Sequence, residues 1–435
     1  MATAIAEPID GGRVAAPDQA QAKDRVESLD LIRGLAVMGI VLANLNSLST
    51  MGMEHSWPPA DGALSAGEKA VWLFEYLFVD GKLRGLFSLL FGAGMIVFLE
   101  RARARGGPAI QLQLRRLFWL LLFGIAHFYL LFDGDILHNY AVAGLIALLF
   151  LGVPPKWMLG LAATALVAFS YFPATGIWDY RSYEVQALAA PADSELRREY
   201  QSEIEAERSE AYAEADVLRE GSLADVVAFR VEHSTGGLVG NVQYWLVEYL
   251  SLMLIGASLF RLGFFSGEWN RRRMLGWGLT GIALSAAISL PLGLWTIREG
   301  FPRALHLFVF YGPVHAIRLP MILGYAAVLV AIAPALLNSG VGRRIAATGR
   351  TAFSNYIGTS LVMALVFQGW GLGLFGQLDK VERLLPLFAV WVLMLIWSPA
   401  WLARFRFGPL EWLWRTFTYL RRPTMRRSIA IPATA

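Results

Sequence analysis

The sequence predicts an all-α fold, that of a polytopic membrane protein with about ten transmembrane helices and an extracytoplasmic helical insertion. Composition is the first reason. Of 435 residues, 56% are hydrophobic and 17% are charged, whereas soluble domains carry roughly 25% charged residues. Mean hydropathy is +0.48. The 15 Trp and 26 Phe residues suit a chain with many anchors at the membrane interface.

Composition also excludes several classes of function. The chain has no cysteine, so disulfides, thiolate nucleophiles and cysteine metal sites are excluded. No metal-ligand spacing such as HExxH is present, and we expect no metal site. The net charge of +4 is modest, and we expect no nucleic-acid partner.

Long apolar segments are the second reason, and they divide the chain. We expect a disordered cytoplasmic tail over 1–28, which lacks the apolar core of a signal peptide. Two membrane halves of about five spans each follow over 29–174 and 241–402, separated by an insertion over 175–240. Residues 403–435 read as an interfacial helix and a basic cytoplasmic tail. The predicted spans are 30–49, 83–100, 113–132, 135–153, 157–174, 241–263, 273–296, 312–337, 351–374 and 383–402. Between the first two, the short apolar run near 66–80 favours an interfacial or re-entrant helix.

Arginine clusters are the third reason, because all of them fall on one side of the membrane when the spans are counted in this way. They are Arg101, Arg103, Arg105, Arg115, Arg116, Arg271, Arg272, Arg273, Arg343, Arg344, Arg350, Arg421, Arg422, Arg426 and Arg427. The positive-inside rule makes that side cytoplasmic, together with both termini. We therefore expect a multi-pass protein of a bacterial inner membrane, in contact with the lipid bilayer.

The insertion over 175–240 is expected to form helices outside the membrane. Its middle is charged and rich in helix formers, with Asp193 as the expected N-cap, and Ser222 and Asp225 are spaced as a capping box. Such helices are either a lid over an extracytoplasmic site or a solvated hairpin on the membrane surface.

A run of polar residues between two apolar stretches is the first place to look for function. Residues 123–145 contain His127, Asp133, Asp135, His138 and Asn139, and ionisable groups near the membrane persist mainly where they pair, face water or do chemistry. Histidine is the usual general base, and a carboxylate can orient its imidazole. Catalytic roles for Asp135 and His138 are therefore one hypothesis, with His127 and Asp133 as substrate-binding residues. The alternative is structural, with Asp135 capping the next helix.

Several stretches of the chain together resemble one known family. They are LDLIRGLAVMGIVLANL, DGKLRGLFSLLFGAGM, RRLFWLLLFGIAHFYLLFDGDILHNYAVAGL, GRTAFSNYIGTS and RFGPLEWLWR. In this order they resemble the YeiB-like bacterial inner-membrane family, a domain of unknown function numbered 418. The resemblance covers nearly all of the chain after residue 28.

The first half is more distantly similar to transmembrane acyltransferases, such as the heparan glucosaminide N-acetyltransferases. Arg33, Asn44, His55 and Trp57 occur in an order similar to the N-terminal pattern of those enzymes. The similarity implies that acyl-CoA on the cytoplasmic side donates an acyl group to an extracytoplasmic glycan or lipid, with no permanently bound cofactor. It also implies that His55 is catalytic and that Asn44 lies at the substrate.

Cationic side chains at the cytoplasmic ends of spans have two explanations. Arg33, Arg115 and Arg116 could hold the phosphates of the acyl donor, because guanidinium forks suit phosphate groups. The alternative is that they only fix the topology, with Asp30 and Arg33 paired on one helix face.

Further charged and polar side chains are candidates for a substrate site within the membrane. Asp80, Lys82 and Arg84 open the second span, where an ion pair between Asp80 and Lys82 could face the site. In the C-terminal half, Arg318 and Asn355 could line the site, and Glu248 is one candidate partner for Arg318, either as a lock between helices or as a path for protons or substrate.

Three functions therefore compete: an acyltransferase, a transporter or exporter of a small molecule or lipid precursor, and a scaffold without catalysis. Intramembrane charges favour transport, but no inverted repeat is visible in the sequence.

Overall fold

The chain is an all-α polytopic membrane protein, as the sequence predicts. The structure is a computed structural model that describes residues 19–59, 62–266 and 268–427; the side chains of 19–26 and of His55 and Ser56 also lie outside the description. Within the described residues the secondary structure is helical, apart from an isolated bridge between Phe405 and Arg426.

Each predicted span overlaps a helix. These helices are α1 (Gln19–Ala43), α5 (Lys82–Ala104), α6 (Ala109–Leu130), α7 (Leu137–Phe150), α8 (Pro155–Ala189), α11 (Thr235–Arg261), α12 (Arg271–Arg298), α14 (Val314–Leu337), α16 (Ala352–Phe367) and α17 (Leu384–Arg404). The spans predicted over 30–49 and 351–374 run past the ends of α1 and α16. Other helices connect or flank them: α2 (Leu45–Ser49), α3 (Gly52–Ser56), α4 (Ala66–Phe78), α9 (Glu195–Glu220), α10 (Leu223–Phe229), α13 (Arg303–Tyr311), α15 (Gly340–Arg350) and α18 (Pro409–Tyr419).

Length and composition make 7 helical stretches of the described chain fit to cross a membrane. They are Ala66–Ala104, Ala109–Leu130, Pro155–Ala189, Leu223–Arg261, Arg271–Arg298, Val314–Leu337 and Leu384–Arg404. Helices α7 and α16 are apolar but shorter. The total number of spans stays a prediction.

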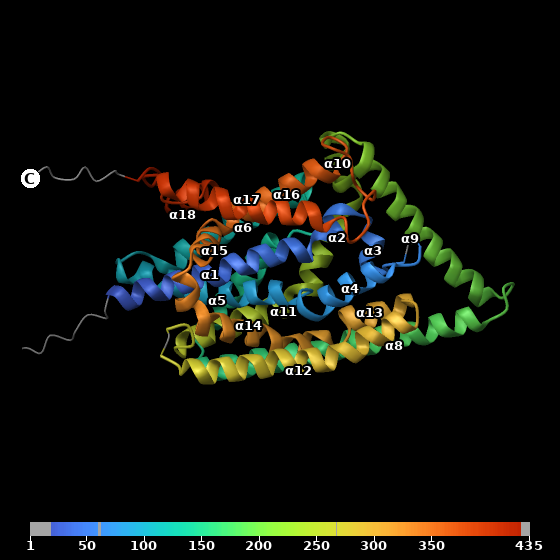
Figure 1. Cartoon of the computed structure of the whole chain (residues 1–435), viewed down its shortest axis with the longest axis horizontal. Coiled ribbons are helices and arrows are strands. Elements are labelled where there is room, and N and C mark those ends of the chain that lie inside the picture. Colours follow the sequence, from blue (N-terminus) through green and yellow to red (C-terminus); the bar gives the residue numbers. More distant parts are fainter. Residues whose placement is uncertain (1–18, 60–61, 267, 428–435) are drawn as a thin grey trace, which may run out of the picture.

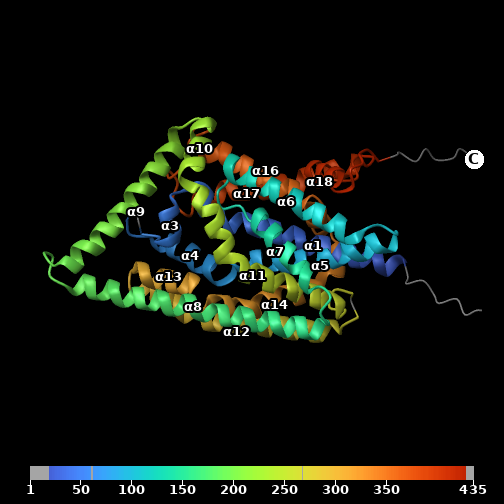
Figure 2. The same cartoon turned by 180° about the vertical axis from the view of Figure 1, so that it is seen from behind.

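The helices form three layers, seen in Figures 1 and 2. Helices α8, α12 and α14 lie on one side, α6, α16 and α17 on the other, and α1, α5 and α11 run between them. The central packing is close because a Cβ atom at Gly92 of α5 would overlap the carbonyl oxygen of Met253 in α11, and one at Gly256 of α11 would overlap that of Leu89 in α5. Small residues permit this approach of two backbones within a membrane.

Helix α4 joins α5 through a tight turn, and its expected interfacial or re-entrant position stays a prediction. It starts with a capping box between Ser65 and Glu68, and Trp72 and Tyr76 are buried against α12 and α13. Gly81 makes the turn with φ of 72°, in the left-handed region that favours glycine. A Cβ atom there would also lie 2.6 Å from the Arg318 guanidinium carbon. The sequence DGK therefore brings α5 and α14 together.

Segment 175–240 is helical, as expected, and α9 crosses one end of the molecule from α8 to α10 (Figure 1). Helix α8 continues past the predicted end of its span, to Ala189. The N-cap of α9 is Ser194, which accepts from the backbone of Arg197, so the expectation of Asp193 is wrong by one residue. The capping box of Ser222 and Asp225 is confirmed.

The buried face of α9 covers loops at this end of the bundle. Ala211, Ala215 and Leu218 share an apolar cluster with Met53 of α3 and with Phe132 in the loop between α6 and α7. The second half of α9 is therefore packed onto the bundle, whereas most residues of 195–210 are exposed, and the choice between a lid and a solvated hairpin stays open.

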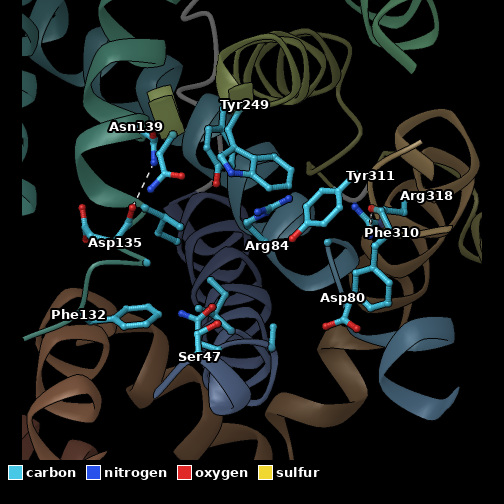
Figure 3. Close-up of a pocket in the computed structure, with 18 residues that line it drawn as sticks. Ser47, Asp80, Arg84, Phe132, Asp135, Asn139, Tyr249, Phe310, Tyr311 and Arg318 are labelled. Atoms are coloured by element: carbon cyan, nitrogen blue, oxygen red, sulfur yellow. Dashed lines mark hydrogen bonds between the residues drawn. The ribbon is translucent and has the colours of Figure 1, made fainter. Parts of the chain in front are cut away.

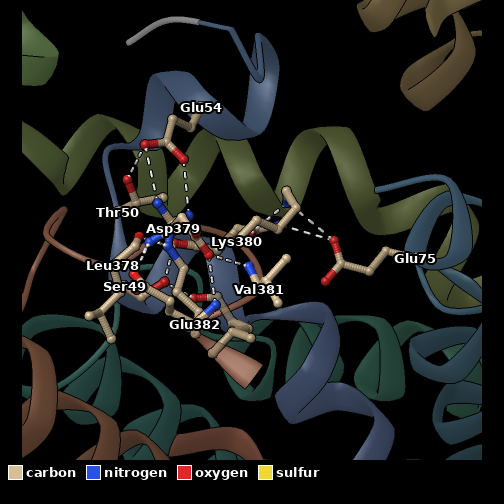
Figure 4. A network of polar contacts seen from close by, with 12 residues as sticks. Ser49, Thr50, Glu54, Glu75, Leu378, Asp379, Lys380, Val381 and Glu382 are labelled. Atoms are coloured by element: carbon tan, nitrogen blue, oxygen red, sulfur yellow. Dashed lines mark hydrogen bonds and ion pairs between the residues drawn. The ribbon is translucent and has the colours of Figure 1, made fainter. Parts of the chain in front are cut away.

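A network of polar contacts fixes α2 and α3 against the loop between α16 and α17 (Figure 4). Lys380 Nζ lies 3.0 Å from Asn46 Oδ1 and 3.3 Å from Glu75 Oε2. Arg383 Nη1 donates to Glu54 Oε2 at 3.0 Å, one residue before His55. The backbone of α3, which carries His55, is thus held by both halves of the chain.

Candidate functional site

A cavity of about 230 Å³, with both charged and aromatic side chains in its wall, lies among the central helices (Figure 3). It is lined by residues from both halves of the chain, namely Ile40, Ala43, Asn44, Ser47, Asp80, Gly81, Arg84, Phe132, Gly134, Asp135, Ile136, Asn139, Asn241, Trp245, Tyr249, Phe310, Tyr311 and Arg318. Among them are the predicted site residues Asn44, Asp80, Arg84, Asp135 and Arg318. Polar groups that the sequence placed in separate clusters therefore meet at one cavity.

Asp135 lies on one wall, between two imidazoles. Nδ1 of His127 is 2.8 Å from Oδ1, and Nδ1 of His138 is 2.8 Å from Oδ2. Tyr356 of α16 donates to Oδ1 at 3.4 Å. All of these side chains are buried. Because a carboxylate only accepts, both Nδ1 atoms carry the proton, which leaves each Nε2 as the basic nitrogen.

The loop between α6 and α7 places this group. The backbone N–H of His138 donates to Asp135 Oδ2 at 3.0 Å, so Asp135 also caps α7. A Cβ atom at Gly124 of α6 would overlap that same backbone nitrogen, so Gly124 lets α7 begin directly against α6. The capping explanation and the network explanation are therefore both realised by one carboxylate.

Neither Nε2 of His127 nor that of His138 has a hydrogen-bond partner among the described residues. The two rings lie behind Asp135 and do not line the cavity themselves. Asp135 is thus the contact between this pair of bases and the cavity.

Arg84 forms another wall, where it is ion-paired with Glu248. Its Nη2 is 3.2 Å from Glu248 Oε2, and Nδ1 of His315 is 3.0 Å from the same oxygen. The guanidinium carbon lies 3.8 Å from the centre of the Trp245 ring, as a cation–π contact. The candidate partner of Glu248 was Arg318, and the structure pairs it with Arg84 and His315 instead.

Arg318 donates from Nη2 to the carbonyl oxygen of Phe310 at 3.1 Å. No carboxylate forms an ion pair with Arg318 in the described part of the chain. Lys82 is buried away from the cavity and donates to the carbonyl of Tyr76, so the expected ion pair with Asp80 is not formed. Asp80 is left to line the cavity near Arg318 (Figure 3).

Asp133, two residues before Asp135, belongs to a different group of charges beneath α9. It acts on Glu214 of α9 together with Glu210 and Arg230. Burial, then the negative charge of Asp133, raise the pKa of Glu214 to about 7, and Arg230 opposes them. This group couples the loop that holds Asp135 to the helix that covers it.

Other predicted site residues lie in contacts between helices. Asn355 donates to the Thr348 carbonyl at 3.0 Å and to Ser398 at 3.1 Å, away from the cavity. Arg33 is paired with Asp30 at 2.7 Å. Arg115 donates to the Thr418 carbonyl at 3.1 Å, and Arg116 stacks on Trp414 at 4.4 Å, so both hold α18. The catalytic candidate His55 lies in α3, with its side chain outside the described residues. Roles of these residues toward a substrate stay predictions.

Comparison with known proteins identifies the family. Residues 259–421 match the family described as "Protein of unknown function (DUF418)". The chain is 30% identical over 417 residues to the uncharacterized protein YxaH of Bacillus subtilis, which covers 91% of this chain and 95% of that protein. The chain belongs to the DUF418 family. It is also 29% identical over 395 residues to the uncharacterized protein YeiB of Escherichia coli, covering 91% of this chain and 96% of that protein. The predicted resemblance is confirmed. No solved structure matches the chain.

Some residues of the cavity in this DUF418 protein escaped the sequence reasoning. Trp245, Tyr249 and Tyr311 line it, but in an apolar helix such aromatic residues look like ordinary packing. The sequence did hold a signal for them: Trp245 and Tyr249 are four residues apart, a spacing that puts both on one helix face, and the intramembrane charge Glu248 lies between them in the sequence.

Proposed function

We propose that this protein is a membrane acyltransferase that moves an acyl group from acyl-CoA on the cytoplasmic side to a hydroxyl or amino group of an extracytoplasmic glycan or lipid. The observation that carries the proposal is Asp135, which is buried between two imidazoles and forms part of the wall of a cavity within the bundle.

Acyl transfer needs a base to accept the proton of the attacking hydroxyl or amine. As the new bond to the acyl carbon forms, the carbon–sulfur bond breaks and the thiolate of coenzyme A leaves. The carboxylate of Asp135 fixes the tautomer and the orientation of His127 and His138, as a carboxylate does in a catalytic triad. His55 is the other candidate base, and its helix shares an apolar cluster with Phe132 of the cavity wall.

The proposed orientation follows the charges. We assign the arginine-rich end of the molecule, where α18 packs on α6, to the cytoplasm, together with both termini. The membrane is then the bacterial inner membrane, and α9 covers the extracytoplasmic end. Arg33, Arg115 and Arg116 are proposed to hold the phosphates of acyl-CoA, after release from their present contacts.

The test uses the purified full chain in proteoliposomes supplied with radiolabelled acetyl-CoA. We expect His55→Ala to abolish acyl transfer, because it removes the candidate general base. His138→Gln should lower transfer by about 10²-fold, because Asp135 would lose one of the two imidazoles that hold it at the cavity wall, and a small misplacement of a reacting group costs that much. His233→Gln, at an exposed histidine of the same chain, is the matched control and should keep activity. The proposal is abandoned if the folded protein neither binds acyl-CoA nor hydrolyses it.

A transporter is the second candidate, supported by Glu248 shared between Arg84 and His315 at the cavity. Intramembrane ionisable pairs of this kind occur along the paths of protons and substrates. Transport predicts counterflow of an unmodified substrate in the same proteoliposomes, with Glu248→Gln abolishing it and His55→Ala leaving it intact. Loss of activity in His55→Ala, with activity kept in Glu248→Gln, would favour acyl transfer.

A further inference from the structure

We propose that the cavity binds a compact molecule in one orientation, because the two ends of the cavity differ in charge. A carboxylate or phosphate group of that molecule lies at the end formed by Arg84 and Arg318, and a hydroxyl or amino group lies at the end formed by Asp135 and Asn139. The inference rests on the proposed function in one respect, because the hydroxyl or amino group is then the one that is acylated.

The cationic end is built from guanidinium groups on different helices, the partly exposed Arg84 of α5 and the buried Arg318 of α14. Figure 3 shows Arg84 near the middle of the view and Arg318 to its right, with Tyr311 between them, and both arginines line the cavity. Glu248 serves Arg84 but is shared with His315, and Arg318 is 3% exposed without an ion-paired carboxylate among the described residues. The carboxylates of Glu248 and Asp80 act on Arg318 through space but form no direct ion pair with it, so an oxyanion in the cavity that bonds its guanidinium directly would stabilise it. Planar guanidinium groups match the geometry of carboxylates and phosphates.

Asp80 lies at this end too, and it would repel an incoming anion. Its carboxylate is not ion-paired with Arg318 in the described structure, so it does not fully neutralise that side chain. Its presence makes a sharp expectation possible, because removing the charge of Asp80 should strengthen the binding of an anion while removing that of Arg318 should weaken it.

The other end presents hydrogen-bond acceptors. The side-chain oxygen of Asn139 is buried and has no partner among the described residues, while its amide donates to the carbonyl of Asp135 at 3.2 Å. Asp135 itself only accepts. Figure 3 places both on the side opposite Arg318. Both oxygens of Asp135 already accept hydrogen bonds from His127, His138 and Tyr356, so the acceptor that lacks a donor at this end is the side-chain oxygen of Asn139. A hydroxyl or ammonium group of the bound molecule would supply that donor. The molecule that fits both ends is therefore a hydroxy acid, an amino acid or a sugar that bears an acidic group.

The test measures binding to the full chain in phosphatidylcholine nanodiscs by calorimetry, without an acyl donor. The probes are glucuronate and glycerol 3-phosphate, with glucose and glycerol as neutral counterparts and inorganic phosphate as the anion alone. We expect the two anionic hydroxyl compounds to bind, the neutral ones to bind at least about tenfold more weakly, and inorganic phosphate to lie between them.

Variants locate the two ends. Arg318→Gln should lower the affinity for glucuronate by about tenfold or more, Arg318→Lys by less, and Asp80→Asn should raise it. Asn139→Leu should lower the affinity for glucuronate but leave the affinity for inorganic phosphate unchanged. The control is Arg298→Gln, the same substitution at an exposed position of α12, which should leave every affinity unchanged. Far-ultraviolet circular dichroism of each variant shows whether the fold is kept.

A second arm separates a lipid headgroup from a soluble molecule. Phosphatidylglycerol added to the nanodiscs will weaken the binding of glycerol 3-phosphate in an Arg318-dependent way if the anion belongs to a lipid, and will have no such effect if it is soluble. Failure of every anionic probe to bind, or equal binding by folded Arg318→Gln, overturns the inference. If the anionic probes bind but no acyl transfer is detected, the proposed function is wrong and this inference stands. If acyl transfer occurs but the acceptor needs no anionic group, this inference is wrong and the proposed function stands.

Discussion

At the scale of single residues, the cavity derives its chemistry from buried charges, one of them fully hydrogen-bonded and one without an ion-paired partner among the described residues. Asp135 is fully engaged by two imidazoles and a helix N-terminus, whereas Arg318 has only a backbone carbonyl as its described partner. Side chains of this kind stabilise a folded protein less than apolar residues would, because desolvating a charge costs several kcal/mol. Their presence at one cavity points to a binding or catalytic use.

Asp135→Asn tests the carboxylate itself. The amide keeps the size of the side chain but loses the charge and one of the two acceptor oxygens, so one imidazole is no longer held. We expect acyl transfer to fall by about 10²-fold or more and the free energy of unfolding to fall by about 2–4 kcal/mol. Radiolabel transfer and thermal unfolding in detergent measure the two effects, and a variant with full activity would exclude Asp135 from the chemistry.

Glu214 gives the protein a dependence on pH. Its pKa in the folded state is about 7, above the ordinary value of 4.5, because of burial and the charge of Asp133. The folded state therefore binds this proton more tightly than the unfolded state does. The resulting stability is fully present below pH 4.5, declines as pH rises toward 7 and is lost above it.

Glu214→Gln should remove this decline. We expect the variant to unfold on the order of 1–3 °C higher than the unmodified protein at pH 8, with the gap closing toward pH 5, in thermal scans at one fixed rate. Glu199→Gln, at an exposed position on the same helix, is the control and should follow the unmodified protein. Parallel curves for Glu214→Gln and the unmodified protein at all pH values would contradict the assignment.

At the scale of helices, the bundle depends on glycines where backbones touch. Helices α5 and α11 carry Arg84 and Glu248, and they approach closely at Gly92 and Gly256. The spacing of these two helices therefore sets the geometry of an ion pair at the cavity.

Gly92→Ala and Gly256→Ala should each destabilise the protein by about 2 kcal/mol or more, since the added methyl group meets a backbone carbonyl that cannot move alone. Gly94→Ala is a control on the same helix, because nothing lies within 4 Å of the Cβ atom that it adds. Thermal unfolding in one detergent compares the three. If Gly94→Ala were as damaging as Gly92→Ala, helix packing would not be the cause.

At the scale of the whole molecule, α9 and the arginine-rich helices mark opposite ends. Helix α9 lies at one end of the long axis, and the start of α1 and helix α18 lie at the other (Figures 1 and 2). This arrangement turns the proposed topology into a labelling experiment, which the chain suits because it contains no cysteine.

We expect Ser202→Cys, on the exposed face of α9, to react with a membrane-impermeant maleimide in intact bacterial cells. Val341→Cys, which replaces an exposed residue of α15, should react only after the cells are opened. The cysteine-free parent chain is the blank. Reversed accessibility of the two sites would invert the topology.

Much of this molecule could be predicted from its sequence because the signals were local. Apolar length located the helices, and the polar run over 123–145 predicted both the cap at Asp135 and its contact with an imidazole. The pairing of Arg84 with Glu248 could not be read, since the partners lie 164 residues apart on helices whose relative rotation no local pattern fixes. For the same reason, Asn355 looked like a site residue and lies in a packing contact.

The shortness of α7 has a consequence for how a substrate reaches the cavity. Its 14 residues span about 21 Å, less than the roughly 30 Å of a bilayer's hydrocarbon layer. The loop that carries Asp135 therefore sits below the level of the headgroups when the other end of α7 is at the opposite interface. A molecule tethered to a lipid would arrive at this depth by diffusing in the plane of the membrane, with its polar part about 9 Å below the headgroups and its acyl chains still among lipids.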